Sequence, residues 1–299
     1  MKVITGGVPI AVVEQETGLS KDVLRKWEAR YSYPLPERNE RGDRLYSREQ
    51  VNRLRTIKRL LDGGYRPSVL FGMEEAELAE LAVPSRVPAD SADDASIHPE
   101  LLELLKTNQP VQFRAMFTRQ LQAQGLQRFV QDTMAPLTTA VGEAWSRGEL
   151  RVYEEHLYSD IASTILRTAL DTIDSPDGRP RMLMTTLPGE AHVLGLLMTI
   201  CLFTLHGAHC LYLGPETPAG DIAQASRAHE VDAVALSFSS AFPTRQIPPA
   251  LRDLRELTPL HVDILAGGEG AERLKPMDGI QLMKDFSGID EYVNKYHEK

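Results

Sequence analysis

The spacing of hydrophobic positions changes along the chain and divides it into three regions joined by one polar stretch. Apolar residues recur every three to four positions, the helical spacing, through residues 1–82 and again through 99–175. In residues 179–299, short continuous apolar runs alternate with amphipathic stretches, which predicts strands alternating with helices. The stretch at 83–98 is rich in Pro, Ser and Asp, which is typical of a linker. We therefore predict three domains with these boundaries.

The first domain begins with two short helices separated by a glycine. Helices are expected over 9–17 and 21–31, with Gly18 in the turn between them and Ser20 as the cap of the second. A stretch punctuated by Pro and Gly then predicts a β-hairpin with its tip near Gly42. Two helices joined by a Gly-containing turn and followed by a hairpin are typical of a winged helix-turn-helix.

Helices complete the first domain and make up the second. One helix is expected over 47–62, and one more between there and the linker. The second domain is expected to hold four helices, at 99–107, 110–123, 126–147 and 150–174. Four antiparallel helices with short loops form a bundle.

The third domain has the pattern of an open parallel α/β sheet. We expect strands at 181–187, 210–214, 232–239, 261–268 and, more weakly, 280–284, alternating with helices at 191–205, 219–229, 246–256, 269–274 and 288–295. The strands are near-continuous apolar runs, as strands buried on both faces should be. Ligands of such sheets bind beyond the carboxyl ends of the strands. The residues at those ends are small or polar: Gly189, Glu190, His192, Gly214, Pro215, Ser237, Ser239, Ser240, Gly267 and Gly268.

Composition and charge narrow the class of protein. The chain has 299 residues, 42% of them apolar and 25% charged, and no apolar run is long enough to span a membrane. Its two cysteines form no CxxC motif, so we expect a reduced, cytoplasmic protein. Residues 1–70 carry 14 Lys and Arg against 9 Asp and Glu, a net of +5, whereas residues 71–299 carry 19 against 33, a net of −14. A basic head on an acidic body indicates that the head alone meets a polyanion.

The second helix of the head has one apolar and one basic face. Val23, Leu24 and Trp27 can point inward. Four cations can point outward, where they would meet phosphates and base edges: Lys21, Arg25, Lys26 and Arg30. The simpler alternative is a solvated basic face on a small helical domain.

The motif "LRKWEARY", the hairpin with "GDRLY" and the helix that follows resemble the winged helix-turn-helix of the MerR family, over residues 8 to about 80. The resemblance implies a double-stranded DNA operator as partner and a dimer on a palindromic site. It also implies DNA contacts from Arg25, Arg30, Tyr31, Arg44 and Tyr46. Trp27 and Leu45 are expected in the core. Where the family has "GGHRLY" this chain has "RGDRLY", and because Asp43 would repel a phosphate we place it away from the DNA backbone.

The carboxyl edge of the third domain carries one histidine with an acid nearby. No GxGxxG, Walker loop or nucleophile elbow is present, which disfavours dinucleotides, triphosphates and serine hydrolysis. His192 lies two residues after Glu190, and this pairing is typical of a metal ligand oriented by a carboxylate. One histidine cannot hold a free metal ion, but it can supply an axial ligand to a metal held by a macrocycle. The alternative is a polar residue at the start of a helix.

The residues at successive strand ends resemble the cobalamin-binding domain, whose pattern is D-x-H-x-x-G, then S-x-L, then G-G. The matching residues here are Glu190, His192 and Gly195, then Ser237 and Ser239, then Gly267 and Gly268. The resemblance implies a Rossmann- or flavodoxin-like sheet that binds cobalamin, with His192 as the lower axial ligand of cobalt.

Head, helical bundle and sheet together resemble the light-responsive transcriptional regulators of the CarH/LitR type. The resemblance implies adenosylcobalamin as the cofactor, with methylcobalamin as the alternative. Trp145, Glu155 and His156 match the family spacing W-x9-E-H, which implies that the bundle caps the adenosyl group with these three residues.

Three positions depart from that pattern. Glu190 replaces Asp and is long enough to reach the imidazole. Ser239 replaces Leu, which we expect to be a modest change in the pocket for the cofactor's tail. Ser146 stands where a second histidine captures cobalt after illumination in the family, and it argues against a bis-histidine photoproduct.

The implied function is non-enzymatic: a homo-oligomeric repressor, a dimer or tetramer, that binds its operator in the dark and is released when light breaks the cobalt–carbon bond. Two alternatives remain open. One is a MerR-like regulator that has a vacant cobalamin fold and is controlled by a protein partner. The other is a cobalamin-dependent methyltransferase module, which would need a methyl-donor domain where this chain has its basic head.

Overall fold

The computed structural model describes residues 7–39, 41–62, 65–82, 97–173 and 176–297. Most of the predicted linker, residues 83–96, lies outside this described part. The chain divides into two compact units, Met1–Asp90 with Val141–Val152 and Ser91–Ala140 with Tyr153–Lys299. The end of the third bundle helix therefore belongs with the head.

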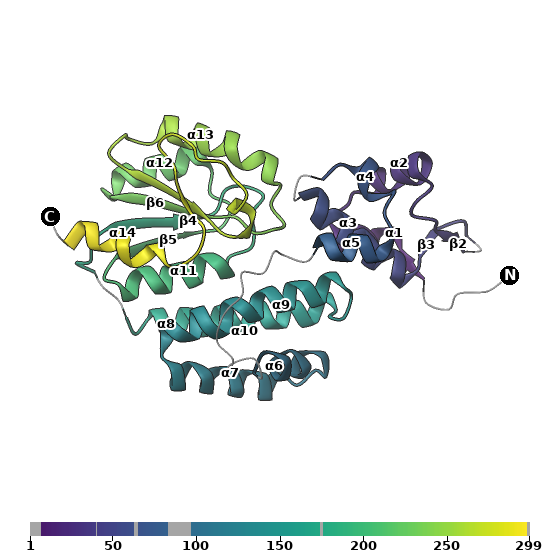
Figure 1. Cartoon of the computed structure of the whole chain (residues 1–299), viewed down its shortest axis with the longest axis horizontal. Coiled ribbons are helices and arrows are strands. Elements are labelled where there is room, and N and C mark those ends of the chain that lie inside the picture. Colours follow the sequence, from purple (N-terminus) through teal and green to yellow (C-terminus); the bar gives the residue numbers. More distant parts are fainter. Residues whose placement is uncertain (1–6, 40, 63–64, 83–96, 174–175, 298–299) are drawn as a thin grey trace. The chain divides into compact units, whose positions relative to one another are not determined.

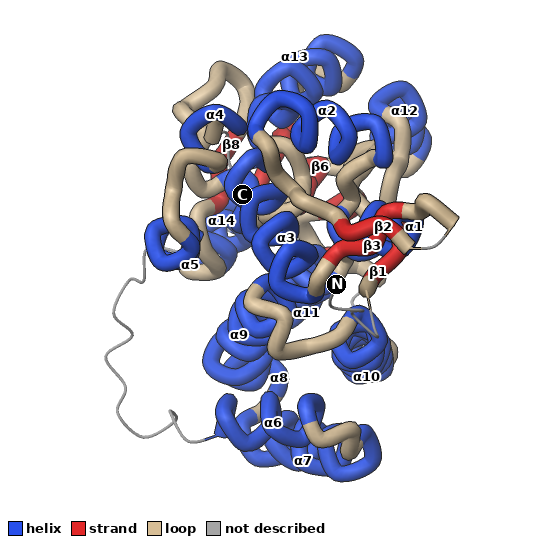
Figure 2. The backbone as a smooth tube through the Cα atoms, turned by 90° about the vertical axis from the view of Figure 1, so that its right-hand side faces the viewer, coloured by secondary structure: helices blue, strands red, loops and turns tan. Residues whose placement is uncertain are grey.

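The head has the predicted helix-turn-helix and wing. Its elements are β1 (Val8–Pro9), α1 (Ile10–Thr17), α2 (Lys21–Tyr31), β2 (Glu37–Arg38), β3 (Arg44–Tyr46), α3 (Arg48–Asp62), α4 (Pro67–Leu70) and α5 (Glu75–Ala82). Gly18 takes a φ of 67°, and the Ser20 hydroxyl accepts a hydrogen bond from the Val23 amide at 3.3 Å, so turn and cap form as predicted. β3 pairs with β2 to make the wing and with β1, a strand the sequence did not predict (Figure 2).

The prediction of one helix after α3 is wrong, because the chain forms α4 and α5 with a turn between them. At the turn, the Gly72 amide donates to the Val69 carbonyl (3.2 Å) in place of a helical i−4 bond. The Glu77 carboxylate then accepts from the Glu74 amide (2.8 Å), which caps the start of α5. The turn allows Phe71 to pack in the head, with its ring centre 5.0 Å from that of Trp27.

The helical region contains the four expected helices, one of which is interrupted. They are α6 (Ile97–Lys106), α7 (Pro110–Gln124), α8 (Leu126–Arg128) continuing through η1 (Phe129–Met134) into α9 (Ala135–Ser146), and α10 (Val152–Leu170). The regular α-helix predicted over 126–147 is wrong in its middle, because η1 is π-helical. Aromatic rings fill the space between the helices: the ring centres of Phe117 and Phe129 are 4.8 Å apart, and Phe113 packs edge-on against Tyr158.

The third region is a five-stranded parallel sheet with helices on both faces (Figure 1). Its strands are β4 (Arg181–Thr185), β5 (His209–Gly214), β6 (Ala233–Ser237), β7 (Asp263–Gly267) and β8 (Gln281–Met283), in the order β5-β4-β6-β7-β8. Its helices are α11 (Leu194–Leu205), α12 (Ala219–Ala228), α13 (Ile247–Leu257) and α14 (Gly288–His297). This is the flavodoxin-like order, in which the strand order reverses between β4 and β6, and ligands of such sheets bind beyond the carboxyl ends of the strands at that point.

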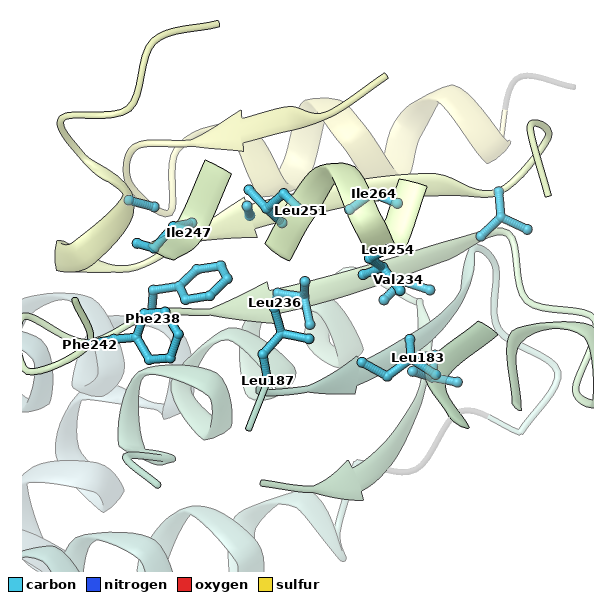
Figure 3. Close-up of a cluster of buried hydrophobic side chains, with 14 of the residues drawn as sticks. Leu183, Leu187, Val234, Leu236, Phe238, Phe242, Ile247, Leu251, Leu254 and Ile264 are labelled. Carbon is cyan, nitrogen blue, oxygen red and sulfur yellow. The ribbon is translucent and has the colours of Figure 1, made fainter. Parts of the chain in front are cut away.

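The core under α12 and α13 is apolar and closed. Leu251 and Leu254 of α13 are fully buried and pack toward Val234 and Leu236 of the central strand (Figure 3). The helix expected over 269–274 is wrong: only a 3-10 turn forms at Glu269–Ala271.

Within the described ranges, no helix is both long and apolar enough to cross a membrane.

Candidate functional site

The carboxyl ends of β4 and β6 carry the polar residues that the sequence singled out. His192 lies in the loop after β4, and α11 begins only at Leu194, so the imidazole is presented from a loop and not from a helix. The loop after β6 begins at Phe238 and brings Ser239 to the same place. The topology therefore assembles one site from two loops at the point where the strand order reverses.

A buried carboxylate orients the imidazole. Glu190 is fully buried, and its Oε1 accepts hydrogen bonds from both His192 Nδ1 (2.8 Å) and the His192 backbone amide (2.9 Å). The prediction that the longer acid can reach the imidazole is confirmed. The His192 side chain is 63% exposed, and no hydrogen bond from the described residues reaches its Nε2. Because Nδ1 faces the carboxylate, Nε2 is the nitrogen available to a ligand.

Ser239 holds the other oxygen of the same carboxylate. The Ser239 amide and hydroxyl donate to Glu190 Oε2 at 2.7 and 2.8 Å, and Ser239 Oγ lies 3.2 Å from His192 Nδ1. Our expectation of a modest change in a tail pocket missed this role, because only the folded loop brings Ser239 to Glu190. Ser237, by contrast, faces Gly195: a Cβ on Gly195 would lie 3.3 Å from the Ser237 hydroxyl.

The environment favours the ionised form of both partners. Burial alone would raise the pKa of Glu190, but the hydrogen bonds from His192 and Ser239 outweigh it and lower that pKa below its ordinary value. The hydrogen bond to Glu190 raises the pKa of His192 against the opposing effect of burial, and the charges of Glu190 and Glu155 add to the rise. An ionised carboxylate beside the imidazole makes His192 a stronger metal ligand once its Nε2 proton is lost.

The start of α10 contributes the two other predicted residues of this unit. Glu155 is near enough for its charge to act on His192, and its Oε1 accepts from the Ser159 hydroxyl at 2.7 Å. His156 is 73% exposed, and its Nε2 lies 3.7 Å from the Glu155 carboxylate. Trp145 falls in the other compact unit, so its predicted place beside His156 stays a prediction.

The glycine pair at the end of β7 allows the loop after β6 to pass close by. Gly268 has a φ of 90°, and a Cβ there would come 2.4 Å from the Phe238 carbonyl. A Cβ on Gly267 would lie 3.1 Å from the Met283 carbonyl. Gly268 therefore requires glycine for the backbone that presents Ser239, whereas Gly267 fits closely against β8. Direct contact of the two glycines with a cofactor stays a prediction.

The outer face of α2 carries the predicted cations. Lys26 and Arg30 are exposed. Arg25 is about half exposed and pairs with Asp22 (3.4 Å), and Lys21 pairs with Glu14 (3.3 Å). Exposed pairs of this kind are weak and can be exchanged for DNA phosphates.

The wing requires corrections to the predicted DNA contacts. Tyr46 is 1% exposed in the core of the head, so its predicted DNA contact is wrong. Arg44 donates to Glu28 Oε2 at 2.8 Å, a partner that the sequence did not reveal. Tyr31 stacks on Phe71, with ring centres 4.5 Å apart, which leaves it partly exposed. Asp43 accepts from the Asn39 side chain (3.0 Å) at the tip of the wing.

The donor set fits a metal that arrives already coordinated. Among the residues that the structure describes, no group of three or more His, Cys, Asp or Glu side chains is arranged to hold a metal ion. One oriented imidazole with an open Nε2, at the carboxyl edge of the sheet, is instead the arrangement expected for an axial ligand to a macrocycle.

Comparisons with known proteins agree with this division of the chain. Residues 8–73 match the MerR HTH family regulatory protein model, and residues 100–169 match a B12 binding domain model. The HTH-type transcriptional repressor CarH of Myxococcus xanthus is 28% identical over 276 residues, which cover 88% of this chain and 89% of that protein. The HTH-type transcriptional repressor CarA of the same organism is 28% identical over 269 residues, 89% of this chain and 88% of that protein.

A solved structure shows the same fold in the second unit. The monomethylamine corrinoid protein of Methanosarcina barkeri superposes with a TM-score of 0.53 at 12% identity, covering 66% of this chain and 96% of that one. This chain thus combines a MerR HTH head with a B12-binding domain, and it is similar to the CarH and CarA repressors over nearly its whole length.

Proposed function

We propose that this protein is a DNA-binding transcriptional repressor whose hold on its operator is controlled by adenosylcobalamin and by light. The observation that carries the proposal is the Glu190–His192–Ser239 cluster, which presents one open imidazole nitrogen at the carboxyl edge of the sheet in a corrinoid-type fold. The repressor names of its two relatives favour a regulator over an enzyme.

The residues of the second unit divide the work of holding the cofactor. His192 Nε2 would ligate the cobalt, while Glu190 fixes the imidazole through Nδ1 and Ser239 fixes the carboxylate. Glu155, His156 and Trp145 would help to enclose the cofactor. Adenosylcobalamin supplies a cobalt–carbon bond that visible light cleaves.

Ser146 limits what this chain can do after illumination. It is 5% exposed, and its hydroxyl donates to the Glu143 carbonyl at 2.7 Å. A serine in this position offers no imidazole to the metal. The light response is therefore expected to end without a second histidine from position 146.

The head supplies operator binding. The exposed cations of α2 enter the major groove and the wing lies along the backbone, and paired heads of a dimer or tetramer occupy two half-sites. Cofactor state controls assembly by favouring one of two conformations.

The test begins with full-length protein loaded with adenosylcobalamin in the dark and freed of unbound cofactor. Its visible spectrum, oligomeric mass and affinity for DNA selected from a random pool are measured before and after green light. We expect a coloured oligomer that binds DNA in the dark and releases it in the light. Loss of colour on removal of free cofactor would refute the cofactor claim and favour control by a protein partner. Retained colour with light-insensitive DNA binding would refute only light control. Methylcobalamin in a parallel sample tests the choice of upper ligand.

Two histidines that flank α11, His192 in the loop before it and His206 directly after it, provide a matched pair of variants. His192→Ala should weaken cofactor binding and alter the cobalt spectrum. His206→Ala removes a histidine that pairs with a carboxylate, Asp290 at 3.2 Å, at the far end of the same helix. It should bind cofactor like the wild type.

A further inference from the structure

The indole of Trp145 lies over a buried arginine of the head. The guanidinium carbon of Arg55, on α3, is 5.0 Å from the centre of the Trp145 ring, a cation–π distance. The Arg55 side chain is only 3% exposed. A guanidinium seldom tolerates such burial unless carboxylates and aromatic faces surround it.

The same arginine joins two helices of the head, α1 and α3. Arg55 donates to Glu16 Oε2 at 2.6 Å, and so connects α3 with the end of α1. It also donates to the Asn52 side chain at 3.1 Å. Arg48 reaches Glu16 as well (2.6 Å), but it is 60% exposed. Arg55 is thus the charged residue through which Trp145 touches the framework of the head.

The corner between α9 and α10, residues 145–151, fits closely against α3. Gly148 has a φ of 72°, and a Cβ on it would overlap the Asn52 side chain at 2.1 Å. The corner is closed by its own backbone, with the Gly148 amide donating to Trp145 O (2.9 Å) and the Glu149 amide to Ala144 O (2.9 Å). The segment Val141–Val152 accordingly belongs to the compact unit of the head.

We propose that this corner is a docking element for the DNA-binding head, and that Arg55 and the bound cofactor compete for Trp145. The competition rests on the proposed function, in which Trp145 caps adenosylcobalamin. In the structure, the indole covers the Arg55 guanidinium and excludes water from it. A cofactor that takes the indole uncovers Arg55 and loosens the head. In the docked state the Trp145 indole covers Arg55 and is not available to the cofactor, so docking lowers the apparent affinity for the cofactor. By thermodynamic linkage, the cofactor weakens docking to the same degree.

The docking contact can be observed without cofactor. The chain has two tryptophans, so full-length protein labelled with 5-fluorotryptophan should give two fluorine NMR signals, with Trp27 as an internal reference. Arg55→Leu should shift the Trp145 signal. Arg48→Leu removes a partner of the same Glu16 without touching the indole, and should leave the signal in place. An unchanged Trp145 signal in Arg55→Leu would overturn docking.

The competition is measured by titrating adenosylcobalamin in the dark. Cofactor should move the wild-type Trp145 signal, and Arg55→Leu should bind cofactor at least about fivefold more tightly. Gly148→Ala displaces the corner from Asn52, a hydrogen-bond partner of Arg55, while the arginine itself is kept. It should tighten cofactor binding in the same direction and serves if Arg55→Leu folds poorly. Equal or weaker cofactor affinity in folded variants would overturn the competition alone. A wild type that binds no cofactor would overturn the proposed function and the competition together, while the cofactor-free spectra would still decide docking.

Discussion

The basic surface of α2 and the cluster at the sheet edge use charge in opposite ways. Arg25 and Lys21 are roughly half exposed and rest on carboxylates that are also exposed. Such pairs contribute about 0–1 kcal/mol each and are readily exchanged for another anion. Glu190 is fully buried with all its hydrogen bonds made, and losing a partner would leave a buried charge uncompensated. One surface is suited to gaining and releasing a polyanion, the other to keeping a single imidazole in place.

The largest expected effect lies in the buried cluster. Glu190→Gln keeps the shape of the side chain but removes the charge that orients His192, and should reduce cobalamin affinity by about 10- to 100-fold in a dark titration. Glu216→Gln is the matched control, because Glu216 is exposed and binds the neighbouring Gly189 amide (3.0 Å) without touching His192. If the two variants bound cobalamin with equal affinity, the buried carboxylate of Glu190 would be no more important than the exposed carboxylate of Glu216.

A smaller effect is expected on the exposed surface. Arg30→Ala should weaken operator binding about tenfold and lower the salt dependence by about one counterion, because one phosphate contact is lost. Arg128→Ala removes an exposed arginine paired with Asp132 in the helical region, and should leave DNA affinity unchanged. The measurement is a fluorescence-anisotropy titration at several salt concentrations, and a parallel loss in both variants would mean that only net charge matters.

Ser239→Ala tests whether the cluster depends on the hydrogen bond from the Ser239 hydroxyl to Glu190 Oε2. The hydroxyl bond to Glu190 is lost while the amide bond remains, so cobalamin affinity should fall about fivefold, or ~1 kcal/mol. Ser240→Ala changes the adjacent serine and should have no effect. If the two variants bind alike, the backbone amide alone positions the carboxylate.

The smallest effect is on the pH dependence of stability without cofactor. The pKa of Glu190 is lowered, so its contribution to stability is present above its ordinary value of 4.5 and is lost as pH falls. The pKa of His192 is raised, so its contribution is complete below its ordinary value of 6.5 and is lost as pH rises through the raised value. Urea unfolding should therefore show the pair's full contribution between about pH 4.5 and 6.5. His192→Ala should lose the decline on the alkaline side, and a decline that persists in this variant would assign it to another group.

Sequence reasoning succeeded where a local signal determines the structure. The Ser20 cap and the Gly18 turn fixed α2, and apolar runs located all five strands of the parallel sheet. The predictions from sequence were wrong where tertiary packing determines the local structure. The Phe71–Glu74 turn has no strong breaker except Gly72, and nothing in the spacing of 126–147 announces η1.

In the candidate site, too, local sequence signals were sufficient for some residues and packing was decisive for others. Glu190 and His192 are two residues apart in the chain, and the predicted contact between their side chains is confirmed. The role of Ser239 depends on how far a glutamate reaches compared with an aspartate, and the burial of Tyr46 depends on β1, a strand of two residues. Distances of this kind arise from the folded backbone, so a motif alone does not provide them.

The π-helical turn η1 has a consequence at a distance. A π turn accommodates one residue more than an α turn, and each residue of a helix advances the side-chain direction by about 100°. The stretch Phe129–Met134 therefore determines the direction in which every later side chain of α9 points, including Trp145 near its end. Removing one residue from η1 would turn the indole by about a quarter of a revolution without altering a single amino acid around Arg55. The direction of the Trp145 side chain, and with it the choice between Arg55 and the cofactor, therefore depends partly on the helical geometry of Phe129–Met134.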